Sequence, residues 1–250
     1  MSPDPRHTGE MPFLEHLEEL RFVLMHVVAA ASVGAVLGWW LAPRVLEDLI
    51  ARTVHTAIVL SPLEAFNERM KLTMLIGLLV ASPYVFYRIW QFVVPGLLKR
   101  ERNMILPMAM LSMALFGVGV WAAYGYVVPL VVRVMDQFTT PNISIQIQLS
   151  ALLSFFYNIA LACGAVMQLP LVTMALTAMG LVTPGYLLRQ WRYALVIVFI
   201  VTAVITPGDV VTAQLIMGVP MTALYFVSVG LSWLVAKRRS EPSIEDATDA

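Results

Sequence analysis

Residues 104–128 read MILPMAMLSMALFGVGVWAAYGYVV, a run of 25 residues without a charged side chain. As an α-helix this run is about 38 Å long, whereas the hydrocarbon core of a bilayer is about 30 Å thick. Backbone N–H and C=O groups find no water inside a bilayer, and a helix bonds them internally. The run therefore predicts a transmembrane helix.

Five further segments have a suitable length and low charge. Together the six predicted spans are 22–41, 70–94, 104–128, 150–178, 191–205 and 211–235. Of the 250 residues, 59% are hydrophobic and only 13% are charged, whereas soluble domains carry about 25% charged residues. We therefore predict an all-α polytopic membrane protein. A single six-helix domain, 13–236, is expected between a disordered N-terminus (1–12) and a disordered tail (237–250).

The distribution of basic residues predicts the orientation of the spans. One side of the membrane receives eleven of them: Arg6, Arg21, Arg88, Lys99, Arg100, Arg102, Arg189, Arg192, Lys237, Arg238 and Arg239. The other side receives five: Arg44, Arg52, Arg69, Lys71 and Arg133. Because cytoplasmic loops are enriched in Lys and Arg, both termini are expected in the cytoplasm.

The spans differ in length, which predicts a cup rather than a regular bundle. The fifth span is a helix of about 22 Å and the fourth one of about 44 Å. A short span requires a thinned bilayer or a covering partner. The connecting segments 43–66 and 129–149 are too long for tight turns, and short surface helices are expected there.

Function classes that need buried charges or metal ligands find little support. Away from their ends, the predicted spans contain almost no ionisable group: His26 lies about one turn into the first span, and the other polar residues are amides such as Gln168 and Gln214, and hydroxyls. Proton-coupled pumps and ion transporters normally keep ionisable groups near the midplane. No zinc-ligand spacing, phosphate-binding loop or hydrolase motif is present. A small-solute secondary transporter therefore remains only an alternative interpretation, and a membrane enzyme is a weaker one. No metal, cofactor or nucleic acid is expected.

Carboxylates gather instead at the predicted cytoplasmic surface. Residues 11–21, MPFLEHLEELR, predict an amphipathic helix that starts just after Pro12, with Glu15 and Glu19 on its polar face. Glu101 stands among basic residues in the loop after the second span. These acids are either ordinary interfacial charges or binding groups for guanidinium, which a carboxylate can hold by two hydrogen bonds.

Four ordered motifs resemble the TatC family. They are HLEELR (16–21), SPY…WQFVVPGL…ER (82–102), QLP (168–170) and TPGD (206–209) followed by Gln214 and Pro220. The resemblance covers residues 11–236 and implies the receptor and scaffold of a twin-arginine protein translocase. The protein would lie in a bacterial or archaeal cytoplasmic membrane. Its cytoplasmic surface would capture the paired-arginine signal peptides of folded cargo.

The resemblance also implies roles for individual residues. Glu19 and Glu101 would bind the two guanidinium groups of the signal peptide, and Leu20, Arg21 and Phe92 would shape the surface around them. Single-span subunits of the TatA and TatB type would dock at spans five and six, where Thr206, Asp209 and Gln214 lie. The translocase is expected to self-associate within the lipid bilayer.

Gln168 departs from the family pattern, which often has Glu before Leu-Pro. An amide does not titrate in the physiological range, so Gln168 is not expected to carry protons. We predict instead that it forms a hydrogen bond to a neighbouring helix or to a carbonyl freed by Pro170.

Overall fold

The computed structural model describes residues 13–54, 56–93, 105–137, 146–205 and 211–240. In chain order the elements are α1 (Phe13–Thr53), β1 (Ala57–Ile58), α2 (Pro62–Val93), α3 (Ile105–Ala122), the π-helical turn η3 (Ala123–Val127), α4 (Val128–Asp136), β2 (Ile147–Gln148), α5 (Leu149–Val166), α6 (Leu169–Ala178), α7 (Pro184–Arg189), α8 (Trp191–Ile205) and α9 (Val211–Ser240). The predicted all-α architecture is confirmed, apart from one pair of two-residue strands.

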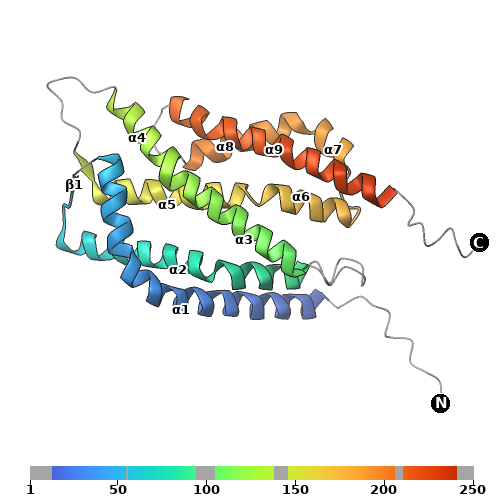
Figure 1. Cartoon of the computed structure of the whole chain (residues 1–250), viewed down its shortest axis with the longest axis horizontal. Coiled ribbons are helices and arrows are strands. Elements are labelled where there is room, and N and C mark those ends of the chain that lie inside the picture. Colours follow the sequence, from blue (N-terminus) through green and yellow to red (C-terminus); the bar gives the residue numbers. More distant parts are fainter. Residues whose placement is uncertain (1–12, 55, 94–104, 138–145, 206–210, 241–250) are drawn as a thin grey trace, which may run out of the picture.

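The molecule has two distinct ends, visible in Figure 1. The first turn of α1, the last turn of α2, the first turn of α3 and the last turn of α9 lie at one end, called here the terminal end. The paired strands β1 and β2 lie at the opposite end, the strand end. The helices run between these ends, as expected for spans that cross the same bilayer.

Helices α1 and α2 are antiparallel and their backbones are in direct contact. A Cβ on Gly38 would lie 2.6 Å from the carbonyl oxygen of Thr73, and one on Gly77 would lie 2.5 Å from the amide nitrogen of Ala35. A Cβ on Gly34 would collide with the carbonyl oxygen of Gly77. Small residues permit this approach, and in a bilayer the dispersion contacts of close helices drive their association.

Prolines interrupt two of the long helices. Pro43 lies inside α1, and Figure 1 shows this helix changing direction before it reaches its C-terminal end. The fourth predicted span is divided into α5 and α6 at Met167 and Gln168, just before Pro170. Proline lacks an N–H and its ring crowds the preceding turn, so a break there is expected.

The strand end is covered by parts of long helices rather than by separate surface helices. Residues 44–53, where a separate surface helix was expected, continue α1 beyond Pro43. Val128–Asp136, in the second expected segment, continue α3 through the π-helical turn. Strands β1 and β2 pair in parallel, with Ala57 opposite Ile147, and join the two connecting segments. The residues expected to form short surface helices are thus helical, but they extend the spans α1 and α3 instead of forming helices of their own.

A polar contact links the extension of α1 to the π-helical turn between α3 and α4. The Tyr124 hydroxyl donates to the Asp48 carboxylate, which also accepts from Arg52 one turn later in α1. A π-turn contains an extra residue relative to an α-turn and thereby rotates the side chains beyond it. In this chain that turn includes Tyr124.

The predicted spans agree with the helices of the structure. Among the described residues, four helical segments are long and apolar enough to cross a membrane: Glu18–Thr53, Pro62–Val93, Ile105–Asp136 and Leu149–Ala178. Two shorter apolar segments, Trp191–Ala203 and Met217–Trp233, complete the six. α8 has 15 residues, as predicted, whereas α9 continues to Ser240, beyond the end at 236 expected for the helical domain.

Candidate functional site

The register of α1 and α2 brings two of the predicted site residues to the same level. Gly34 faces Gly77, and four residues further along α1, Gly38 faces Thr73, four residues back along α2. Continuing this register toward the terminal end places Glu19 opposite Phe92. Figure 1 shows the two helices side by side over this length.

The α1 residues of the candidate site point in different directions. Glu19 is half-buried, whereas Leu20 and Arg21 are exposed. Phe92 is half-buried on the last turn of α2. Successive helical residues are about 100° apart, so Glu19 lies on the side of α1 nearer the bundle while Leu20 extends outward. Glu19 and Phe92 therefore lie toward the bundle at the terminal end, whereas Leu20 and Arg21 lie at the same end on more exposed sides of α1.

Three of the predicted site residues lie outside the described residues. Glu101 belongs to the segment 94–104 between α2 and α3, and Thr206 and Asp209 belong to the segment 206–210 between α8 and α9. The helices that flank the first segment meet it at the terminal end, where α2 ends and α3 begins (Figure 1). The positions of these three side chains remain predictions.

Gln168 is part of a hydrogen-bonded network that joins three helices. Its Nε2 donates to the main-chain carbonyl of Ser112 in α3, at 2.9 Å. The Ser112 hydroxyl accepts from the indole Nε1 of the buried Trp90 in α2, at 2.7 Å. The structure thus contains the hydrogen bond to a neighbouring helix that was predicted for Gln168.

Gln214 forms a hydrogen bond within the chain that was not expected. Its Nε2 donates to the Phe199 carbonyl of α8 at 3.0 Å, and a Cβ on Gly218 would lie 2.9 Å from the Phe199 ring. The amide of Gln214 therefore has a hydrogen-bond partner within the chain. Gln214 joins α8 to α9, and α8 presents the exposed side chains of Val196, Ile197 and Ile200 beside it.

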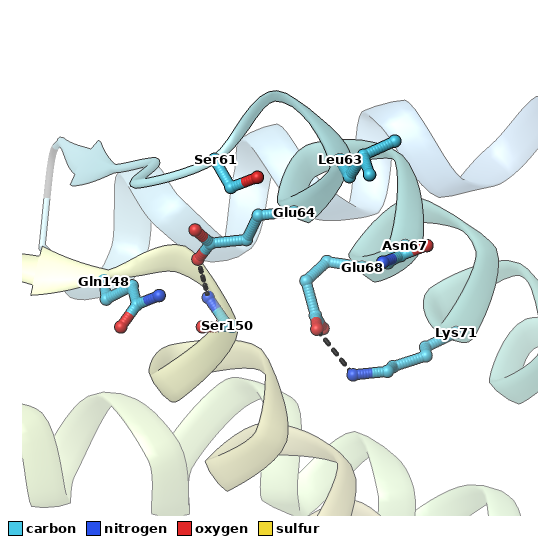
Figure 2. Close-up of a pocket in the computed structure, with 8 residues that line it drawn as sticks. All are labelled: Ser61, Leu63, Glu64, Asn67, Glu68, Lys71, Gln148 and Ser150. Carbon is cyan, nitrogen blue, oxygen red and sulfur yellow. Dashed lines mark hydrogen bonds and ion pairs between the residues drawn. The ribbon is translucent and has the colours of Figure 1, made fainter.

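The structure also reveals a buried acid that sequence reasoning missed. Glu68 in α2 is only 2% exposed, and its Oε1 lies 2.6 Å from Nζ of Lys71 (Figure 2). Its neighbour Arg69 stacks its guanidinium 4.2 Å from the centre of the Trp39 ring. The sequence signal was the spacing of Glu68 and Lys71 by three residues, which places them on one helix face. It was indistinguishable from ordinary charges beside a membrane span.

The described part of the chain has no cluster of three or more His, Cys, Asp or Glu residues able to hold a metal ion. The single cysteine, Cys163, is half-buried in α5 beside Gly119 of α3. The contact is close, because a Cβ on Gly119 would lie 2.6 Å from the Cys163 carbonyl oxygen.

Comparison with known proteins identifies the family. The family description "Sec-independent protein translocase protein (TatC)" matches residues 15–220, which include every predicted site residue. The chain belongs to the TatC family. A TatC from Koribacter versatilis is 32% identical over 255 residues, covering 96% of this chain and 92% of that protein. A TatC from Helicobacter pylori is 34% identical over 223 residues, covering 89% and 86%.

Solved TatC structures resemble this fold. A crystal structure described as the twin-arginine translocase receptor TatC has a TM-score of 0.79 and 30% sequence identity, covering 88% of this chain and 99% of that chain. A second, of TatC in the detergent DDM, has a TM-score of 0.77 and 28% identity. The chain is thus a multi-pass component of a Sec-independent protein translocase. This assignment favours protein translocation over small-solute transport.

Proposed function

We propose that this TatC-family chain is the signal-peptide receptor of a twin-arginine translocase and that its binding surface is the terminal end. The observation that carries the proposal is the likeness to a solved TatC described as the twin-arginine translocase receptor. The surface consists of the first turns of α1, the last turn of α2 and the segment that carries Glu101.

The chemistry of the two acids suits a pair of arginines. Glu19 is carried by helix α1, whose position is set by the close α1–α2 contact, so the backbone at Glu19 does not need to be ordered on binding. A carboxylate can accept two parallel hydrogen bonds from one guanidinium but not from a lysine ammonium. Glu19 and Glu101 would each bind one arginine, and this arrangement would reject a peptide with paired lysines.

We further propose that α8 and the start of α9 are the docking face for single-span subunits of the TatA and TatB type. α8 is 15 residues long and therefore about 8 Å shorter than a typical hydrocarbon core. The mismatch costs a fraction of a kcal/mol per Å, and a covering helix removes part of it. Thr206 and Asp209 would line this face, while Gln214 would stabilise it through its bond to Phe199.

Both termini are proposed to face the cytoplasm of a bacterial or archaeal cell. The excess of Lys and Arg supports this, because the basic segment 94–104 connects α2 to α3 and the basic residues 237–239 lie in the last turn of α9, which is at the terminal end. In that orientation the signal peptide would meet the receptor before cargo crosses the membrane.

Peptide binding to the purified chain in detergent tests the proposal. A signal peptide with paired arginines should bind, and its paired-lysine variant should bind at least about tenfold more weakly, because each lost bidentate contact removes a charge-assisted hydrogen bond. Equal affinity for the two peptides would contradict the receptor proposal. Flux of a small solute through vesicles that contain only this chain would support the transporter interpretation instead.

A further inference from the structure

A polar cavity of about 500 Å³ lies at the strand end, between the first turns of α2 and the start of α5 (Figure 2). Glu64, Asn67, Glu68 and Lys71 of α2 line one wall, and Gln148 belongs to the opposite one. The cavity and the proposed signal-peptide surface lie at opposite ends of the molecule, so a ligand bound in the cavity would not touch that surface.

Glu68 supplies a hydrogen-bond acceptor that the described chain leaves unused. Its Oε1 is paired with Lys71, but its Oε2 is buried and has no hydrogen-bond partner among the described residues. The nearby Tyr157 hydroxyl donates to the main-chain carbonyl of Glu68 at 3.0 Å. A buried carboxylate oxygen without a donor is costly, and such an oxygen is normally satisfied by a ligand, water or side chain.

The charges of the cavity define the ligand that it can take. Glu64 accepts the backbone N–H groups of Leu60 and Ser150, at 2.9 and 3.0 Å, so its carboxylate is held in place at the wall. Two carboxylates and one ammonium line the cavity, and within the described part of the chain the ammonium, that of Lys71, pairs with Glu68 alone. The Lys71 side chain is 55% exposed and can also contact an anion. A ligand with a cationic N–H donor for Glu68 and an anionic group for Lys71 therefore matches both signs.

The surroundings of the cavity place it at a membrane boundary. Leu63 lines the cavity, and the exposed side chains of Phe66, Met70 and Met74 succeed it along α2 at intervals of three and four residues. Residues at these intervals share one helix face. In a chain that spans the bilayer, this apolar stripe meets acyl chains, while the charged cavity at its end lies near the level of the lipid head groups.

We propose that this cavity binds the head group of a phospholipid with a primary amine, of the phosphoethanolamine type. The ammonium donates to Oε2 of Glu68, the phosphate accepts from Lys71, and the acyl chains lie along the stripe from Leu63 to Met74. A choline head group has the same charges but no N–H donor, so it leaves the buried oxygen unsatisfied.

Native mass spectrometry of the full-length chain, titrated with ethanolamine and choline lipids of identical acyl chains, tests this site. The first ethanolamine lipid should bind about tenfold more tightly than the choline lipid, the ratio expected from one hydrogen bond to a charged group. Glu68→Gln should abolish that preference, and Lys71→Gln should weaken binding of both lipids. The matched control is Glu47→Gln, at an acid of α1 outside the cavity, and it should keep the preference.

Three results would overturn the proposal. One is equal affinity of the unaltered chain for the two lipids, a comparison that requires no folded variant. Another is an unchanged ethanolamine preference in a folded Glu68→Gln protein. The third is displacement of the bound lipid by an equal concentration of soluble phosphoethanolamine, which would identify a water-soluble ligand instead.

Discussion

Gly34 of α1 and Gly77 of α2 face each other so closely that a Cβ on Gly34 would collide with the carbonyl oxygen of Gly77. Gly38 and Thr73 repeat this contact one helical turn away. Because the two pairs set the register of α1 against α2, they also determine which α2 residue lies opposite Glu19. The packing of the bundle thereby positions a proposed binding residue at its terminal end.

Gly34→Ala should destabilise the protein by about 1–3 kcal/mol, the usual range for overpacking, because the added methyl meets backbone rather than a movable side chain. Thermal unfolding in detergent measures the effect. Gly117→Ala is the matched control: a Cβ there has no neighbour within 4 Å, so this variant should be neutral or slightly more stable. A similar loss in both variants would show that the contact has no special role.

Gln168→Leu should cost about 1 kcal/mol, since it removes the hydrogen bond to the Ser112 carbonyl inside the bundle. Gln168→Glu should also lose this bond while the new carboxylate is ionised, because it no longer donates. Comparison with Gln137→Leu, at an exposed position, separates the hydrogen bond from a general effect of the substitution. If a transport rate followed a titration that Gln168→Leu abolished, Gln168 would belong to a proton pathway after all.

Tyr124→Phe should lower stability by about 0.5–1.5 kcal/mol, the net value of one hydrogen bond, because it removes the donor to Asp48. The contact links the end of α1 to the π-helical turn, so amide exchange in residues 44–53 should increase as well. Tyr126→Phe is the control, as Tyr126 is exposed in the same turn. Equal exchange in the two variants would argue against this link.

Cysteines at Leu215 and Val219, both exposed on α9, should crosslink to a single-span partner subunit in native membranes. A cysteine at Val118, exposed on α3, should crosslink far less. The reason is the short α8 beside the first two positions, which a partner helix would cover. Equal accessibility of all three cysteines to lipid-soluble reagents, with no partner crosslink, would identify the α8–α9 face as an ordinary lipid boundary.

The spans could be predicted from sequence because weakly charged apolar runs of 15 to 29 residues leave few alternatives in a bilayer. The break before Pro170 was likewise implied, since proline removes a helical hydrogen bond. The α1–α2 register was not predictable, because Gly34, Gly38 and Gly77 indicate close packing only once their partners are known. Glu68 was missed for a similar reason: burial depends on α5, which is distant in sequence, whereas its spacing to Lys71 is local.

A double-mutant cycle between the chain and a twin-arginine peptide tests the central claim most directly. Glu19→Ala and Glu101→Ala should each weaken binding by about 1–3 kcal/mol, and Glu18→Ala, at the exposed neighbouring acid, should not. Each glutamate should show a coupling energy of at least about 0.5 kcal/mol with one peptide arginine. Unchanged affinity in both single variants, or effects that simply add with every arginine substitution, would contradict the assignment of Glu19 and Glu101 as the residues that bind the signal peptide.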